Sequence, residues 1–320
     1  MNQLITGGIF ALILAGILGL WFIPVLTRLK FGQEIREEGP KWHAKKSGTP
    51  TMGGLIFITA IVISCLLCYL LGMQIGIEIV MLLAISLIYG VIGFIDDYIK
   101  VILKRNLGLT AKQKFLLQLV AAIAFVAWAV YGTKISTNIS IPFTSLSFDM
   151  GVFYIPFVTV VILATVNSIN LTDGLDGLAT SITCIVAIFF MLFAKRMESN
   201  AVALFAAIVL GSLIGFLIYN KYPAKVFMGD TGSLFLGGAV CGMAILLEQP
   251  LALLIVGFVY VMESLSVIMQ VTSFKLTGKR IFKMSPIHHH FEMCGWNEVK
   301  IVVVFTLVTL VLCSLMYFLG

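Results

Sequence analysis

The chain has 320 residues, of which 60% are hydrophobic and only 11% are charged, and its net charge at pH 7 is +6. Together with a mean hydropathy of +1.08, this composition excludes a soluble globular domain and predicts one integral membrane domain over residues 1–320. The six cysteines show no disulfide framework.

Ten apolar runs are long enough to cross a bilayer core of about 30 Å, which requires roughly 20 residues per helix. They lie near residues 4–27, 53–72, 77–95, 115–131, 152–169, 175–193, 201–219, 232–248, 251–273 and 299–319. We therefore predict an all-α polytopic protein with ten transmembrane helices.

The basic residues predict the orientation of these helices. With ten spans the loops alternate between two sides, and every Lys and Arg except Lys134, Lys195 and Arg196 falls in one set of loops. Because basic loops stay in the cytoplasm, we expect both termini outside and five cytoplasmic loops that form the active site. Residues 132–151 alternate apolar and polar side chains, which predicts a small β-hairpin on the outer side.

The first cytoplasmic loop ends in Lys46 and the run Gly48-Thr49-Pro50-Thr51-Met52-Gly53-Gly54. Hydroxyls such as that of Thr51, and glycines at a helix entrance, allow a backbone to approach a ligand closely. The basic residues of the loop have a simpler explanation in topology and anionic-lipid contact.

The third run ends with Asp96 and Asp97. Because the negative end of a helix dipole disfavours acids there, this pair indicates a cationic partner. Consecutive residues differ by about 100° around a helix, so we expect different roles for the two. The bases Lys100, Lys112 and Lys114 follow.

The stretch from Asn170 to Gly177 places Asp173 and Asp176 between two apolar runs. Acids beside the hydrocarbon are costly and usually mark a site. Thr172 or Asp173 can instead cap the next helix, but capping does not account for Asp176.

The loop that begins at Asn220 leads to Asp230, at the start of the eighth run. The free N–H groups of a helix start can bind phosphate oxygens, while Asp230 offers a hard ligand to a metal ion. Phe227 is either a membrane-interface anchor or a surface on which a base stacks.

Glu263 is the one acid deep in an apolar run, and we favour a structural role for it. His288, His289 and His290 follow in the last cytoplasmic loop. Contiguous side chains converge poorly on a tetrahedral ion, so donation to an anionic substrate fits these histidines better.

Acids, lysines and histidines on one membrane face are what a magnesium diphosphate requires. A site at the membrane boundary suits a soluble phosphorylated donor and a lipid acceptor. The residues alone therefore predict a magnesium-dependent phosphoryl transferase that acts on a lipid.

Five motifs in register resemble the polyprenyl-phosphate N-acetylhexosamine-1-phosphate transferase family over nearly the whole chain. They are Gly48–Gly54, Asp96-Asp97-Tyr98, Asn170–Leu178, Gly229-Asp230-Thr231-Gly232-Ser233 and Pro286-Ile287-His288-His289-His290-Phe291-Glu292. The last motif favours the branch that uses a muramoyl-pentapeptide donor.

This resemblance implies the reaction and the partners. UDP-N-acetylmuramoyl-pentapeptide would give its phospho-sugar to undecaprenyl phosphate, which forms lipid I and releases UMP during peptidoglycan biosynthesis. It implies Mg²⁺ as cofactor and a homodimer in the bacterial plasma membrane, and no nucleic acid as partner.

The resemblance also implies roles for single residues. Asp96 would deprotonate the lipid phosphate, Asp230 would bind the magnesium ion, and Asp97 would be a further essential acid. The nucleotide pocket would contain Asn170, Asp173, Asp176, Asn220 and Phe227. The phosphates and the sugar would contact Thr51, Lys46, Lys100, His288, His289 and His290. Either Lys112 or Lys114 would be a further site lysine.

Two other functions fit the same sequence less well. The first is a sibling enzyme that transfers N-acetylglucosamine-1-phosphate. The second is an ion-coupled transporter, which places its ionisable groups near the membrane midplane, where only Glu263 lies. The residues leave open whether transfer takes one step or two.

Overall fold

The computed structural model describes residues 2–29, 48–73, 75–102, 108–144 and 146–320. The helices that precede the hairpin are α1 (Asn2–Arg28), α2 (Gly54–Leu70), α3 (Ile77–Ile102), α4 (Ala111–Ala127) and the π-helical turn η2 (Trp128–Gly132). The strands are β1 (Asn138–Ser140) and β2 (Ser147–Asp149). The remaining helices are η3 (Gly151–Phe153), α5 (Tyr154–Thr172), α6 (Leu178–Arg196), α7 (Asn200–Asn220), α8 (Gly229–Leu246), η4 (Pro250–Ala252), α9 (Leu253–Val256), α10 (Phe258–Thr277), α11 (Ile287–Met293) and α12 (Glu298–Leu319).

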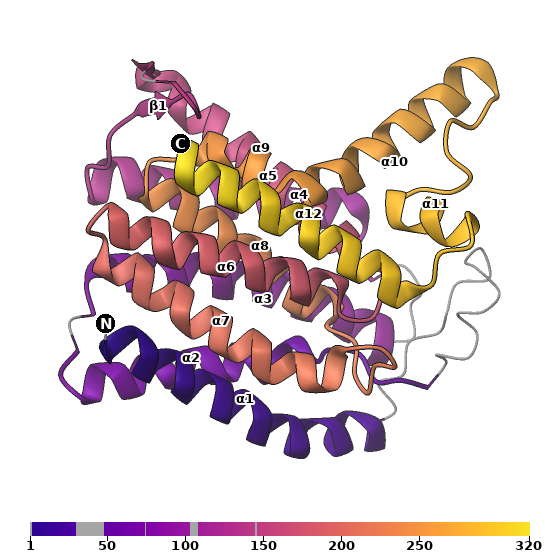
Figure 1. Cartoon of the computed structure of the whole chain (residues 1–320), viewed down its shortest axis with the longest axis horizontal. Helices are drawn as coiled ribbons and strands as arrows, with labels where there is room; N and C mark the ends of the chain where they lie inside the picture. The colour runs from indigo at the N-terminus through magenta and orange to yellow at the C-terminus, as the bar shows by residue number, and fades with distance from the viewer. Residues whose placement is uncertain (1, 30–47, 74, 103–107, 145) are drawn as a thin grey trace.

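The helices gather in one bundle (Figure 1), and their length and hydropathy are those of a multi-pass membrane protein. In the described part of the chain, eight helices are long and apolar enough to cross a membrane. One bent pair adds a ninth candidate, and α2 is a shorter apolar helix. Each predicted run therefore contains a helix, while the exact number of spans and their orientation remain predictions.

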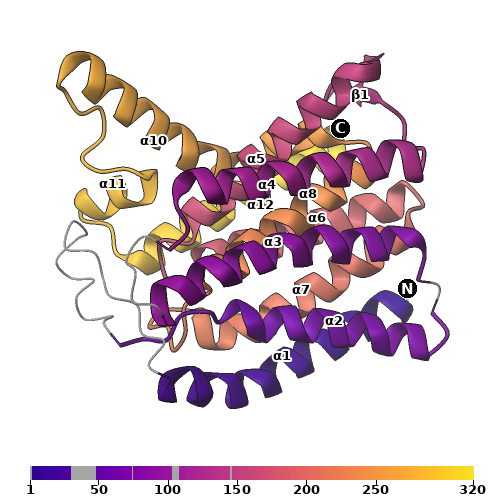
Figure 2. The ribbon, with the colours of Figure 1, turned by 180° about the vertical axis from the view of Figure 1, so that it is seen from behind.

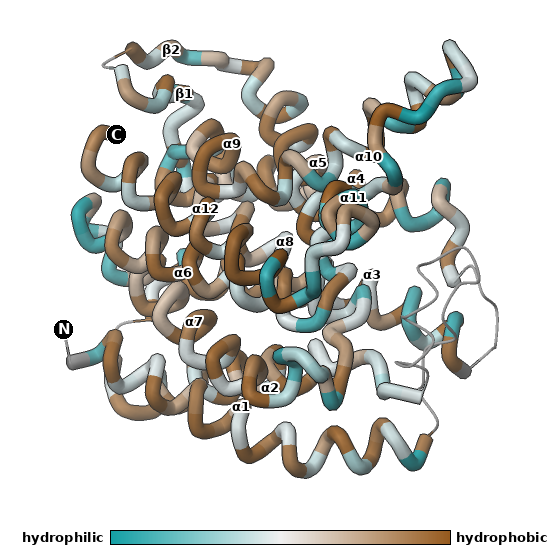
Figure 3. The backbone as a smooth tube through the Cα atoms, turned by 45° about the vertical axis from the view of Figure 1, so that its right-hand side comes forward, coloured by the Kyte–Doolittle hydropathy of each residue, from teal (hydrophilic) through white to brown (hydrophobic). Residues whose placement is uncertain are grey.

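Both termini and the β1–β2 hairpin lie at one end of the bundle, and α11 lies at the other (Figures 1 and 2). The two strands are antiparallel, with Ile139 opposite Phe148, so the predicted small hairpin is present. Figure 3 shows hydrophobic helices in the bundle, with hydrophilic stretches gathered around α11 and at the tip of α10.

Helix α8 is the most deeply buried of the candidate spans, because its glycines admit neighbouring backbones. A Cβ on Gly237 would lie 2.7 Å from the Cα of Val166 in α5, and one on Gly238 would lie 2.9 Å from the carbonyl oxygen of Ile85 in α3. Small residues permit this close approach between helices in a membrane.

The glycine pair of α7 is likewise used inside the protomer. A Cβ on Gly211 would meet the carbonyl oxygen of Gly8, and one on Gly215 would meet that of Leu12, both in α1. These glycines therefore pack α7 against α1.

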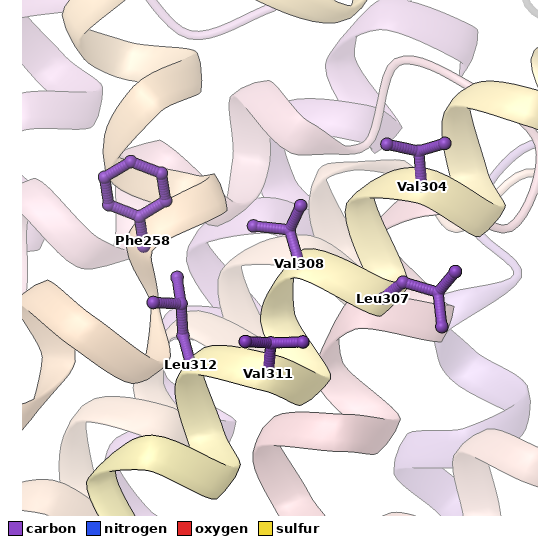
Figure 4. Close-up of a pocket in the computed structure, with 6 residues that line it drawn as sticks. All are labelled: Phe258, Val304, Leu307, Val308, Val311 and Leu312. Atoms are coloured by element: carbon purple, nitrogen blue, oxygen red, sulfur yellow. The ribbon is translucent and has the colours of Figure 1, made fainter.

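The run predicted as one helix over 251–273 is broken at Gly257, where α9 and α10 meet at 83°. Helix α10 consequently leaves the bundle (Figure 1). A pocket of about 410 Å³ lies beside the break, between Phe258 and α12 (Figure 4). Its other lining residues are Val304, Leu307, Val308, Val311 and Leu312. This lining offers no polar group for chemistry, so the candidate active site lies elsewhere.

Candidate active site

The two adjacent acids lie in the last two turns of α3, which continues past the predicted run to Ile102. They have different partners, as their angular separation predicts. Asp96 is buried; its Oδ1 accepts a hydrogen bond of 2.8 Å from the N–H of Leu109, and its Oδ2 lies 2.5 Å from Lys100 Nζ. The lysine one turn further along α3 thus supplies the cation that acids at this helix end require.

Asp97 reaches across to the start of α8. Its Oδ2 accepts from the N–H and the hydroxyl of Thr231, at 2.8 and 2.7 Å, and its Oδ1 accepts from the N–H of Asp230 at 3.2 Å. The first N–H groups of a helix have no partner within that helix. Asp97, in α3, therefore caps the start of α8 and holds the backbone of Asp230 in place.

Asp230 is the centre of the charged cluster. Its Oδ2 accepts from Lys100 at 2.9 Å and from Lys114 at 2.6 Å, and its Oδ1 accepts from Asn170 at 2.9 Å. These partners come from α3, α4 and α5. Lys112 is exposed, so it is Lys114 that α4 directs to the acids.

Asp96, Asp97 and Asp230 can hold a metal ion. Each offers one carboxylate oxygen, and the three oxygens lie within 4.8 Å of one another. Carboxylate oxygens are the hard ligands that Mg²⁺ and Ca²⁺ take. The donor set therefore fits a hard divalent cation.

Glycines bring α8 close enough to α3 for this cluster to form. A Cβ on Gly93 would overlap the carbonyl oxygen of Asp230, at 2.1 Å. Gly229 has φ +73°, and its Cβ would lie 2.6 Å from Asp97 Oδ2 and 2.8 Å from Thr51 Oγ1. Only a residue without a side chain fits both positions.

The glycine-rich run before α2 pairs with the loop before α8. The N–H groups of Gly53 and Gly54 donate to the carbonyls of Phe227 and Met228, at 2.8 and 2.9 Å, and the N–H of Phe227 donates to the carbonyl of Pro50 at 2.8 Å. The close backbone approach predicted for this run is thus made to the protein itself. Thr51 is buried beside the cluster, whereas Lys46 lies outside the described residues.

The stretch between α5 and α6 brings a further acid to the site. Burial raises the pKa of Asp173 well above its ordinary value, and the charges of Asp230, Asp97 and Asp176 add to this; a backbone hydrogen bond from Gly229 opposes it. Asp173 thus lies close enough to Asp97, Asp176 and Asp230 for their negative charges to repel its own.

The other predicted nucleotide-pocket residues are held by protein contacts. Asp176 Oδ2 accepts from the N–H of Ala224 at 2.9 Å. The side-chain amide of Asn220 accepts from Thr180 Oγ1 at 2.6 Å and donates to the carbonyl of Val226 at 3.0 Å. These bonds shape the loop that carries Phe227, whose ring is half-buried.

The three histidines have separate surroundings. His288 is buried, and a Cβ on Gly174 would lie 2.3 Å from its Nε2. His289 pairs with Glu292, with 2.6 Å between Nδ1 and Oε2. His290 Nδ1 accepts from the N–H of Lys283 at 3.1 Å. Of the three, His288 is the one that borders the Asn170–Gly177 stretch.

Two contributors to this site were missed or undervalued from the sequence. Ser233 accepts from the same Asn170 amide, at 2.8 Å, and Glu263 Oε2 lies 3.0 Å from His288 Nδ1. The signal for Glu263 was its depth in an apolar run, because a buried carboxylate needs a donor as partner. The sequence did not indicate which donor that was.

The sequence of this chain is similar to known proteins and to a known family model. A family model described as glycosyl transferase family 4 matches residues 79–248, and a phospho-N-acetylmuramoyl-pentapeptide-transferase signature matches residues 46–58.

Curated proteins named phospho-N-acetylmuramoyl-pentapeptide-transferase are similar over nearly the full length. The one from Clostridium botulinum is 51% identical over 98% of this chain and 94% of its own. That from Bacillus cytotoxicus is 51% identical over 99% and 97%. That from Halalkalibacterium halodurans is 50% identical over 97% and 95%.

Proposed function

This chain belongs to glycosyl transferase family 4, and on that premise we propose that it synthesises lipid I. It transfers phospho-N-acetylmuramoyl-pentapeptide from the UDP-linked donor to undecaprenyl phosphate and releases UMP. The observation that carries this proposal is the cluster of three acids, Asp96, Asp97 and Asp230, with two lysines, Lys100 and Lys114. The chain that holds this cluster is about half identical to proteins named phospho-N-acetylmuramoyl-pentapeptide-transferase. The proposed setting is the cytoplasmic face of the bacterial plasma membrane, as the distribution of basic residues predicts.

We propose that Asp230 binds Mg²⁺, with Asp96 and Asp97 beside it. The bound ion would neutralise charge on the transferring phosphoryl group. Lys100 and Lys114 share Asp230 Oδ2, and substrate phosphates would offer them alternative partners. These ammonium groups then stabilise the diphosphate where negative charge develops.

Asp96 is the proposed base of a one-step transfer. Its carboxylate would take the proton from the lipid phosphate, whose oxygen then attacks the β-phosphorus of the donor. The bond from that phosphorus to UMP breaks, and UMP leaves as an anion. Asp97 is poorly suited to be the nucleophile of a two-step route, because both its oxygens accept hydrogen bonds from α8.

The donor would bind between the Asn170–Gly177 stretch and the loop before α8. Phe227 is half-buried there, and stacking of a base on an aromatic ring typically contributes about 1–3 kcal/mol. Asn170, Asp173, Asp176 and Asn220 would form the walls of the pocket. Thr51, Lys46 and the histidines would contact the phosphates and the sugar.

The test is UMP release by the purified protein with undecaprenyl phosphate and UDP-N-acetylmuramoyl-pentapeptide, with and without Mg²⁺. Turnover only in the presence of Mg²⁺ supports the proposal. Turnover only with UDP-N-acetylglucosamine identifies the sibling activity, and ion flux across liposomes without nucleotide turnover identifies a transporter. We also propose that the chain forms a homodimer, as the family resemblance implies, and light scattering in detergent tests this.

A further inference from the structure

We propose that Glu263 is a positioning residue for the transfer reaction: it holds the ring of His288 so that Nε2 faces the substrate. This inference rests on the proposed function, which supplies a phosphorylated substrate beside the Asn170–Gly177 stretch. Glu263 touches no reacting group itself and acts through the imidazole.

The contact between the two side chains is buried. Glu263 is 0% exposed and His288 is 1% exposed. Glu263 Oε2 lies 3.0 Å from His288 Nδ1. A carboxylate in such a place is costly unless a donor satisfies it, so this contact determines where the ring can be.

The contact also determines which ring nitrogen faces the site. A carboxylate only accepts hydrogen bonds, so the hydrogen of a neutral ring lies on Nδ1, and Nε2 is the nitrogen that remains. Nε2 is buried beside Gly174 and has no hydrogen-bond partner among the described residues. Because Nε2 of this tautomer is a hydrogen-bond acceptor, the substrate group that it fits is a hydroxyl or amide N–H of the sugar or peptide, not a phosphate oxygen.

Glu263 holds the backbone at His288 as well as its ring. Oε2 lies 3.5 Å from the N–H of His288, at the start of α11. Gln270, two turns further along α10, accepts from the N–H groups of Ile281 and Phe282 at 3.0 and 2.9 Å. Residues seven apart lie on one helix face, so one face of α10 fixes the segment that carries the histidines.

The contacts of α10 with the histidine segment explain why this helix buries polar side chains. Helix α10 leaves the bundle at the break (Figure 1), yet its residues Glu263, Ser266 and Gln270 are buried. Buried polar side chains on an apolar helix are costly and usually serve a site. Here Glu263 connects the helix to His288 of α11, and Gln270 connects it to the segment before α11. Ser266 donates to the carbonyl of Glu263 within the same helix.

The variant E263Q tests the inference. It keeps the volume of the side chain, but its amide can donate as well as accept, so the hydrogen of the ring is no longer confined to Nδ1. We expect kcat for UMP release to fall about 10- to 100-fold, the effect typical of groups that orient a functional histidine. The KM for the UDP-linked donor should change far less.

A double-mutant cycle separates positioning from a structural role. In the H288N background, E263Q should cost less than about threefold, because the group through which Glu263 acts is gone. Equal losses in both backgrounds would mean that Glu263 acts on the fold, and would overturn the inference. The matched control is E248Q, since Glu248 accepts from the N–H of Ser136 at 3.0 Å near the hairpin.

A spectroscopic measurement does not depend on activity. The ¹⁵N shifts of the His288 ring, assigned with H288N, should indicate hydrogen on Nδ1 in the wild type and a changed distribution in E263Q. An unchanged tautomer in E263Q would contradict the inference. If E263Q does not fold, E263D in the same cycle replaces it. A wild-type protein that releases no UMP would instead contradict the proposed function, so the two failures are distinct.

Discussion

Thr231 donates two hydrogen bonds to one oxygen of Asp97, from its backbone N–H at 2.8 Å and from its hydroxyl at 2.7 Å. An acid at the end of one helix thereby caps the start of another. Both groups are buried, at 4% and 1% exposure. The position of Asp230, one residue before Thr231, depends on this contact.

The substitution D97N should lower stability and turnover together. Its amide can point a donor at the N–H of Thr231, which leaves buried groups unpaired at a cost of about 1–3 kcal/mol. Thermal unfolding in detergent and UMP release measure the two effects, and T231V, which removes only the hydroxyl, should show smaller losses. A D97N protein as stable as the wild type but without turnover would mean that Asp97 acts directly on the substrate.

The substitution D230N should reduce UMP release by about 10²-fold or more, the usual effect of losing one charge-stabilising group. It should also remove the response to added Mg²⁺, because the proposed metal ligand is lost. A titration of turnover against MgCl₂ measures both. Full turnover in D230N would refute the metal assignment.

The substitutions K114Q and K112Q should differ strongly. Lys114 Nζ lies 2.6 Å from Asp230 Oδ2, whereas Lys112 is exposed. We expect K114Q to lower kcat about tenfold or more and K112Q to change it much less. UMP release from the two variants, purified in parallel, decides which lysine belongs to the site.

The substitution D173N should stabilise the protein above acidic pH while it lowers activity. The pKa of Asp173 is raised when folded, so between its ordinary value and that raised value the folded state holds more protons than the unfolded state. Stability then falls as pH rises through this window. In EDTA, the melting temperature of D173N should therefore depend less on pH across this range than that of the wild type. The same dependence of melting temperature on pH in both proteins would mean that a group other than Asp173 takes up the proton on folding.

The substitution G93A should move α8 away from α3. Its Cβ would overlap the carbonyl oxygen of Asp230, and we expect a loss of about 1–3 kcal/mol with reduced turnover. The control is G90A, whose nearest neighbour would be the side chain of Phe235 at 3.2 Å. Equal melting temperatures for the two variants would mean that the helices adjust without cost.

Much of the fold and the character of the site could be predicted from the sequence. Apolar length determines where a helix can cross a bilayer, and each of the predicted runs contains a helix. Acids and lysines at helix ends are visible in the sequence. The different roles expected for Asp96 and Asp97 followed from helix geometry alone, and the two side chains do have different partners. These features are local, so neighbouring residues are sufficient to determine them.

The partners were decided only by the tertiary structure. No local pattern indicates that Lys114 meets Asp230, that Gly211 packs on α1, or that Glu263 pairs with His288. Each contact joins residues far apart in the chain, and each depends on how the helices rotate and cross. The bend at Gly257 also depends on tertiary contacts. Helix α10 is held outside the bundle by its bonds to α11 and to the segment before it. The sequence by itself determined which charged groups lie near the ends of the apolar helices, and packing determined which of them touch.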